Sequence, residues 1–265
     1  MAMAEHAAAA AAVSSPAVPA WTGVALSVSL VLVAVVIAWR QHLGLAREIV
    51  IASVRAGVQL LAVGAVLLFL FEHAGLPGGF AWLGVMVVIA GQVAGRRGAG
   101  LHRARWVATA AIGGAAAVTL GVLLLFGVVQ SEPRVVVPVG GMVVSGSMQA
   151  AGVTLARMVA EARQQRPVIE ARLALGLSGA EAFAAHRREL LRTSLMPTLD
   201  ATKVVGLISL PGAMTGLILA GVSPEVAIRY QIVVMYMLVA AAVMAALGAA
   251  ELGQRMLFTP AHQLR

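Results

Sequence analysis

The sequence predicts an all-α membrane protein with about seven spanning helices, and two observations carry this prediction. First, 60% of the 265 residues are hydrophobic and only 11% are charged, whereas roughly 25% of residues are charged in an ordinary soluble domain. Second, the mean hydropathy is +0.93, and apolar runs of the length that crosses a bilayer as a helix, about 20 residues, recur along the chain. We therefore expect most of the chain to lie in lipid.

The first 20 residues differ from the rest because they are rich in alanine and contain two prolines near their end. Glu5 stands where a signal peptide would carry basic residues. We expect a flexible tail over residues 1–20, not a cleaved signal, and a single membrane domain over 21–265. The apolar runs in that domain predict helices at 21–39, 49–71, 80–94, 106–129, 135–156, 201–221 and 226–250.

Two of these runs need separate justification. The run at 49–71 contains Arg55, and an arginine at the middle of a spanning helix costs roughly 3 kcal/mol on insertion scales. Its many Val, Ile, Leu and Phe residues each favour insertion by roughly 0.3 to 0.6 kcal/mol, so the sum favours a spanning helix. The run at 80–94 is short and contains glycine, which makes it the weakest of the seven.

The distribution of basic residues predicts an orientation with the N-terminus outside and the C-terminus inside. In that orientation the outward connections hold only Arg134 and Arg229. The inward connections and the C-terminal tail hold the other fifteen loop arginines, which are Arg40, Arg47, Arg96, Arg97, Arg103, Arg105, Arg157, Arg163, Arg166, Arg172, Arg187, Arg188, Arg192, Arg255 and Arg265. Such an excess of basic residues is typical of the cytoplasmic side.

One long connection, residues 157–198, is too polar to span and lies on the predicted cytoplasmic side. Apolar residues at helical spacing precede Gly176, which breaks the run, and Ser178 with Glu181 forms a capping box that starts a new helix. We expect two short helices joined at an elbow, the second ending at Pro197. A jointed, amphipathic hairpin suits docking to a soluble partner, and the alternative is a solvated linker.

Ionisable residues inside predicted spans are candidates for function because lipid makes them costly. Arg55 and Gln59 share one face of the second predicted helix, and Asp200 and Lys203 lie together at the start of the sixth. Each pair is a candidate for the transport pathway. In the simpler alternatives, Arg55 reaches to the lipid interface, and Asp200 and Lys203 neutralise each other.

Small and weakly polar residues form stripes on two predicted helices. Ser145 and Gln149 share a face of the fifth with Gly141 and Gly152, a pattern that indicates either helix packing or the lining of a pathway. The sixth carries a stripe beside Pro211, formed by Gly212, Gly216 and Ala220. We interpret this second stripe as a close helix contact, at a subunit interface or at a gating joint.

Two motifs are similar to those of known transporters. Glu170, Ala171 and Gly176 resemble the E-A-A-x3-G core by which permeases of ABC transporters contact their ATPases, with Arg172 in place of the second alanine. A longer resemblance links this chain to the FetB-type permeases. It covers the segments 52–60, 141–148, 197–216 and 218–235, including the run PTLDATKVVGLISLPGAMTG.

The resemblance implies a permease subunit that works as a homodimer in a bacterial inner membrane and exports iron or a related metal species. It also implies a separate ATPase subunit that binds the ATP and contacts Glu170, Ala171, Gly176, Ser178 and Glu181. The alternatives are export of a nucleotide sugar or another organic solute, an ion-coupled secondary transporter, and a membrane scaffold or sensor.

Composition and motifs exclude several other functions. The chain has no cysteine, and its only lysine, Lys203, does not lie in a G-x4-G-K-[ST] loop, so no P-loop holds ATP in this chain. No acid–base pair or nucleophile constellation predicts an enzyme. Basic residues lie between apolar runs, which argues against nucleic-acid binding. Histidines and carboxylates show no ligand spacing, so a metal site is unknown, and the methionines of the spans are most simply packing residues.

Overall fold

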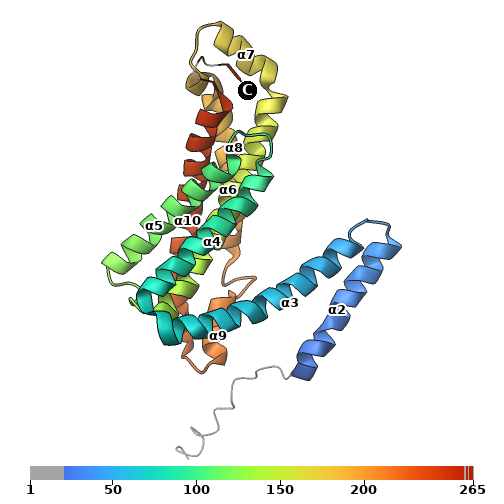
Figure 1. Ribbon diagram of the computed structural model, residues 1–265, viewed down its shortest axis with the longest axis vertical. Coiled ribbons are helices and arrows are strands. Elements are labelled where there is room, and N and C mark those ends of the chain that lie inside the picture. Colours follow the sequence, from blue (N-terminus) through green and yellow to red (C-terminus); the bar gives the residue numbers. More distant parts are fainter. Residues whose placement is uncertain (1–20, 260, 262, 265) are drawn as a thin grey trace, which may run out of the picture. The chain divides into compact units, whose positions relative to one another are not determined.

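The computed structural model describes residues 21–259, 261, 263 and 264, so the predicted tail at 1–20 lies outside the described residues. Nearly all described residues are helical, and they form no β-strand, which confirms the all-α prediction (Figure 1). The chain divides into two compact units. The first unit consists of the chain up to His73 together with Gly212–Ala227. The second unit comprises Ala74–Pro211 and Ile228–Arg265.

Among the described residues, five helical stretches are long and apolar enough to cross a bilayer. They are Trp21–Arg40, Ala46–Arg97, Ala104–Leu125, Pro133–Gln164 and Pro224–Leu257. The prediction of a polytopic membrane protein is therefore confirmed. The number of seven spans and the N-out orientation stay predictions.

The stretch Ala46–Arg97 contains two of the predicted spans. It consists of α3 (Ala46–Phe69), a π-helical turn (Leu70–Ala74) and α4 (Gly75–Arg97). Its 52 residues would measure about 78 Å as one helix, more than twice the hydrocarbon thickness of about 30 Å. Gly75 interrupts it with a left-handed φ of +56°. The predicted short third span is thus a helix of 23 residues.

In the first unit, α2 (Trp21–Arg40) and α3 pack side by side. A short connection joins them and turns through two left-handed residues, His42 (φ 51°) and Gly44 (φ 71°). Most of their large apolar side chains are exposed, as expected for helices that face lipid or another protein chain. The same unit holds the eight-residue α9 (Gly212–Leu219).

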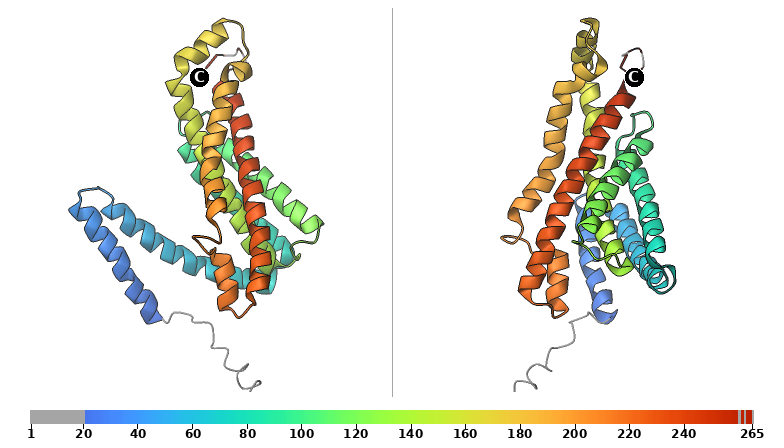
Figure 2. Two further views of the ribbon diagram at one scale, coloured as in Figure 1. Left: turned by 180° about the vertical axis from the view of Figure 1, so that it is seen from behind. Right: turned by 90° about the vertical axis from the view of Figure 1, so that its left-hand side faces the viewer.

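The second unit contains the protein's core, in which α4, α5 (Ala104–Leu125) and α6 (Pro133–Gln164) pack together (Figure 2). Glycines allow the close approach of these helices. A Cβ on Gly95 of α4 would lie 2.5 Å from Cα of Arg105 on α5, and one on Gly140 of α6 would lie 2.5 Å from Leu83 Cδ2. This is packing through small residues, which is common between membrane helices.

The predicted sixth span at 201–221 is wrong as a single helix. Its residues are divided between the end of α8 (Gly179–Val204), an irregular segment at 205–211, α9, and a turn. The chain leaves helical geometry at Val205 (ψ 133°) and turns at Gly206 (φ +82°), and Pro211 has no N–H for a helical hydrogen bond. Within the described residues of this chain, a Cβ on Gly212 or Gly216 would meet no atom within 4 Å, so the close contact expected of this stripe stays a prediction.

The predicted helix end at Pro197 is wrong as well. α8 continues through Pro197 to Val204, and α6 contains Pro138 in the same way. Proline removes one backbone hydrogen bond and bends a helix, but membrane helices tolerate it. α10 (Pro224–Leu257) completes the chain's long helices.

Candidate functional site

The elbow predicted in the connection 157–198 is present, between α7 (Arg166–Ala174) and α8. Gly176 takes a left-handed φ of +91°, and the N–H groups of Gly176 and Leu177 donate to the carbonyls of Leu173 (3.0 Å) and Arg172 (3.3 Å). This is a Schellman ending, for which glycine is the favoured residue. The break predicted at Gly176 is confirmed.

The capping box is also present at the start of α8. The Glu181 N–H donates to Ser178 Oγ at 3.3 Å, and Ser178 N donates to Glu181 Oε2 at 2.9 Å. Both side chains are therefore used inside the elbow, where they fix the direction in which α8 begins. Glu170 is similarly engaged, in an exposed ion pair with Arg166 on the same helix at 2.8 Å.

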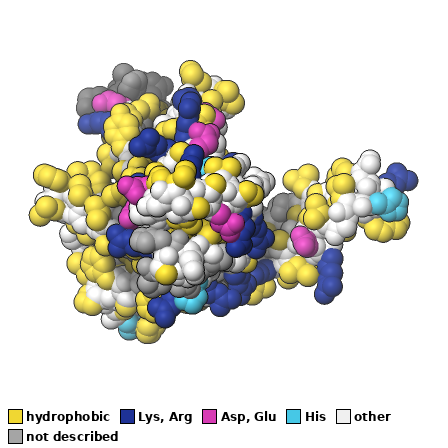
Figure 3. Space-filling model, turned by 90° about the horizontal axis from the view of Figure 1, so that it is seen from above, with side chains coloured by type: hydrophobic (Ala, Val, Ile, Leu, Met, Phe, Trp, Pro, Cys, Tyr) yellow, Lys and Arg dark blue, Asp and Glu magenta, His cyan; other side chains and the backbone are white. Residues whose placement is uncertain are grey.

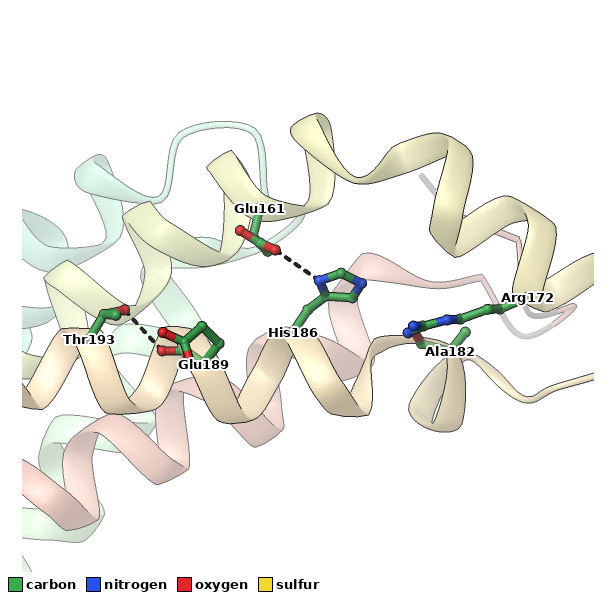
Figure 4. Close-up of polar contacts among 6 residues, drawn as sticks. All are labelled: Glu161, Arg172, Ala182, His186, Glu189 and Thr193. Carbon is green, nitrogen blue, oxygen red and sulfur yellow. Dashed lines mark hydrogen bonds and ion pairs between the residues drawn. The ribbon is translucent and has the colours of Figure 1, made fainter.

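Arg172 connects the two arms of the elbow (Figure 4). Its Nη1 donates to the carbonyl oxygen of Ala182 on α8 at 3.0 Å, a partly buried hydrogen bond. Ile169 of α7 and Phe183 of α8 are fully buried. Phe183 makes an edge-to-face contact with Phe258, the residue that follows α10, with 6.5 Å between the ring centroids. The elbow is thus a packed structure, not a solvated linker.

Polar side-chain contacts attach the hairpin to neighbouring helices. Nδ1 of His186 on α8 lies 2.8 Å from Oε1 of Glu161 on α6, with both side chains mostly buried (Figure 4). Nη1 of Arg187 lies 2.6 Å from Oε2 of Glu251 on α10, which also pairs with Arg255 at 3.2 Å. These contacts link α8 to both α6 and α10.

The outer surface of the elbow is exposed and partly apolar. Leu175 at the tip is 81% exposed, and Val168 and Leu177 are also exposed. Glu170 and Ala171 lie on the same exposed end. Leu175, Val168 and Leu177 together form a small exposed apolar patch on the turn.

A second feature is a pocket of about 640 Å³ between α6, α8 and α10, all within the second unit. Its polar side chains are Ser145 and Gln149 from α6 and Thr198 and Thr202 from α8. The remaining lining is apolar or glycine: Pro138, Gly141, Met142, Gly146, Pro197, Ala201, Val205, Met235, Leu238, Val239 and Ala242. The pocket carries no charged side chain and suits a ligand that is mostly apolar with a few hydrogen-bonding groups.

The structure brings together only part of the predicted pathway set. Ser145 and Gln149 line the pocket. Asp200 and Lys203 form an exposed ion pair at 3.0 Å on α8 and do not line it, which agrees with the mutual-neutralisation alternative. Arg55 and Gln59 lie on α3 in the first unit.

The remaining residues of the predicted stripes lie elsewhere. Pro211 belongs to the irregular segment before α9, and Gly152 packs on Arg97, whose Cδ would lie 3.1 Å from an added Cβ. Pathway roles for the predicted residues stay predictions.

Sequence reasoning missed several residues. Thr198 and Thr202 follow Pro197 and were hidden by the expectation that the helix ends there, although their four-residue spacing indicates one helix face. The pairing of His186 with Glu161 joins residues 25 positions apart and has no local signal. No group of three or more His, Asp or Glu side chains able to hold a metal ion occurs among the described residues.

Comparisons with known proteins identify the family. The model of the "Uncharacterised protein family (UPF0014)" matches residues 21–258. The chain is 39% identical over 240 residues to UPF0014 membrane protein STAR2 of Oryza sativa subsp. japonica, covering 89% of this chain and 83% of the relative. It is 37% identical to Protein ALUMINUM SENSITIVE 3 of Arabidopsis thaliana (91% and 88% covered).

A bacterial relative carries a name that describes transport. The chain is 35% identical to the "Probable iron export permease protein FetB" of Escherichia coli strain K12, with 91% of this chain and 93% of the relative covered. No solved structure gives a significant match. The resemblance found in the sequence is confirmed, and the chain belongs to the UPF0014 family of membrane proteins.

Proposed function

We propose that this chain is the permease subunit of an ABC transporter and that a separate ATPase subunit, which binds the ATP, docks on the elbow between α7 and α8. The observation that carries the proposal is the elbow itself. An exposed leucine, Leu175, projects from a turn that a Schellman ending, a capping box and the Arg172 bond all hold in place. The E-A-x4-G pattern lies on the same turn.

The continuity of the helices supplies a route from the elbow to the pocket. α6 runs unbroken from the α7 side of the hairpin to Pro138, and α8 runs from the elbow to and beyond Pro197. Both prolines line the pocket between α6, α8 and α10. Helices bend most easily at proline. Movement of α7 by a bound ATPase would therefore bend α6 and α8 at these two prolines and open or close the pocket.

For the cargo, we propose iron or a related metal species, on the strength of the FetB relative's name. Export of an organic solute is the second candidate, and the pocket favours it. Hard cations prefer carboxylate oxygens, whereas the pocket offers only hydroxyl, amide and thioether groups. An ion-coupled transporter would instead call for charges at mid-membrane, and the pocket lining has none.

The proposed assembly is a homodimer in a bacterial inner membrane, surrounded by lipid. The irregular segment at 205–211 supports a second copy. Its Leu207 and Ile208 are more than four-fifths exposed, and non-helical backbone at membrane depth is tolerated only against protein or a water-filled cavity. A second copy is one partner that would cover this segment.

Co-purification tests the proposal. The chain, expressed with its ATPase, is expected to retain it through affinity purification in detergent. Glu170→Arg and Gly176→Pro should release it, while Glu189→Arg, an exposed glutamate on α8 away from the elbow, should not. Retention by both elbow variants would overturn the docking site. For the cargo, vesicles containing the pair are given ATP and either iron or a candidate organic solute. ATP-dependent movement of iron would support the first candidate.

A further inference from the structure

We propose that a second pocket in this chain binds a phosphate group, and that the phosphate of an anionic lipid headgroup supplies it. The pocket measures about 610 Å³ and is formed by the α4–α5 connection, the start of α8 and the end of α10. His102, Arg103, Gly179, Ala180, Gln254 and Arg255 are among its lining. The pocket adjoins the proposed docking turn, but binding of a phosphate there needs neither an ATPase nor a cargo.

Basic side chains lie in and near this pocket. Arg103, Arg255 and His102 line it. The segment 96–105 contains three further arginines and no carboxylate, and Nη2 of Arg163 on α6 would lie 2.8 Å from a Cβ on Gly100 of the same segment, but these four arginines are outside the pocket lining. The one acidic lining residue, Glu251, is shared by Arg187 and Arg255. Figure 3 shows Lys and Arg side chains distributed over this end of the molecule. Arg103 forms no ion pair with any described residue, so its charge is available to a ligand.

Hydrogen-bonding groups also face the pocket. Gly179 and Ala180, the first two residues of the 26-residue α8, line the pocket. The Ser178–Glu181 capping box already occupies this helix N-terminus with a carboxylate, so the phosphate site depends on Arg103 and Gln254. Gln254 is only 5% exposed, and its Oε1 is buried with no hydrogen-bond partner. Buried polar atoms are normally paired. The side-chain amide can rotate to present either its NH₂ donor or its carbonyl acceptor. The donor can then bond a phosphate oxygen, or the acceptor can bond a headgroup hydroxyl.

The pocket also lies at the level where lipid phosphates are expected. Trp106, three residues after Arg103, is 75% exposed, and exposed tryptophans mark the membrane–water interface. On α10, the apolar run that ends at Ala250 is followed by Glu251 and Arg255, as at the end of a spanning segment. A headgroup phosphate is therefore the nearest anion of suitable chemistry.

Native mass spectrometry of the delipidated full chain in detergent tests this site. Phosphatidylglycerol is titrated against phosphatidylcholine, with inorganic phosphate as a competitor. The chain is expected to bind phosphatidylglycerol more tightly, with phosphate competing. Arg103→Gln should weaken this binding about fivefold, the contribution of one arginine near an anionic surface. Gln254→Leu, which keeps the volume and removes both polar atoms, should weaken it as well. Arg192→Gln, an exposed arginine on α8 outside the pocket, is the matched control and should bind like the wild type.

Equal binding of the two lipids, or equal behaviour of the Arg103 and Arg192 variants, would overturn the proposal. Binding of inorganic phosphate without phosphatidylglycerol would confirm the phosphate site and overturn the lipid as its source. Since Arg103 is exposed, Arg103→Gln is expected to fold. This variant therefore decides the outcome even if Gln254→Leu does not fold. None of these results depends on ATPase docking, so a failure here leaves the proposed function untouched.

Discussion

The guanidinium of Arg172 donates a hydrogen bond to the backbone carbonyl of Ala182, 3.0 Å away across the elbow. Arg172 occupies the position at which the E-A-A-x3-G pattern has its second alanine. The departure from the pattern therefore has a structural role, because the arginine joins α7 to α8 across the turn that carries the exposed Leu175.

The first prediction concerns this tie. Arg172→Ala should lower the free energy of unfolding by about 1–2 kcal/mol, the contribution of a partly buried hydrogen bond to a charged group. It should also reduce ATPase stimulation, since the docking turn loses its support. Thermal unfolding in detergent and ATPase assays measure the two effects. Arg188→Ala, an exposed arginine on α8, is the control, and an equal effect of both variants would argue against the tie.

The second prediction concerns the crossing of α4 and α5. Gly95→Ala should destabilise the protein by about 1–3 kcal/mol, because the new Cβ would meet backbone atoms of Arg105 that cannot move aside. Gly114→Ala on α5 is the matched control, with no atom within 4 Å of the added Cβ. Its unfolding temperature should be unchanged or slightly higher. If the two variants melt at the same temperature, the close crossing is wrong.

The third prediction tests the pairing of Glu161 with His186. Glu161→Ala leaves the mostly buried imidazole without its partner and should cost about 1–3 kcal/mol of stability. Glu161→Gln keeps an acceptor at the same distance and should cost less. Thermal unfolding of the two variants gives the comparison. Identical losses would mean that the contact contributes only through packing.

The fourth prediction concerns topology. Because the chain has no cysteine, single cysteines report sidedness without background. In intact cells, Gln130→Cys, in the connection after α5, should react with a membrane-impermeant maleimide, whereas Leu175→Cys should react only after lysis. The reverse pattern would contradict the N-out, C-in prediction.

The fifth prediction separates the pocket between α6, α8 and α10 from the charged pair beside it. Gln149→Leu removes the longest polar side chain of the pocket and should reduce transport severalfold without releasing the ATPase. Asp200→Asn changes only an exposed ion pair. Transport at the wild-type rate in Asp200→Asn would remove that residue from the pathway, and unchanged transport in Gln149→Leu would remove the pocket.

Much of the fold was predictable, because its signals are local. Hydropathy located the long apolar helices, and Gly176 with the Ser178–Glu181 capping box located the elbow, since these motifs act within a few residues. The errors lie where local rules compete with tertiary packing. Pro197 is a helix terminator by propensity, yet α8 continues through it, and the apolar run at 201–221 is divided by an irregular segment.

The site was less predictable than the fold. Ser145 and Gln149 were found because four-residue spacing places them on one helix face, but Thr198 and Thr202 reach the same pocket from another helix. Likewise, the spacing of Glu161 and His186 along the chain gives no indication that α6 and α8 place them 2.8 Å apart. Contacts between distant segments depend on packing, which a single sequence does not reveal.

The most direct test of the central claim is the ATPase rate of the partner subunit in lipid nanodiscs, with and without this chain. The wild-type chain is expected to stimulate ATP hydrolysis. Leu175→Glu, which places a charge at the exposed apolar tip of the elbow, should abolish the stimulation, and Glu189→Arg should preserve it. Stimulation that persists unchanged in Leu175→Glu, or an absence of stimulation by the wild type, would contradict it.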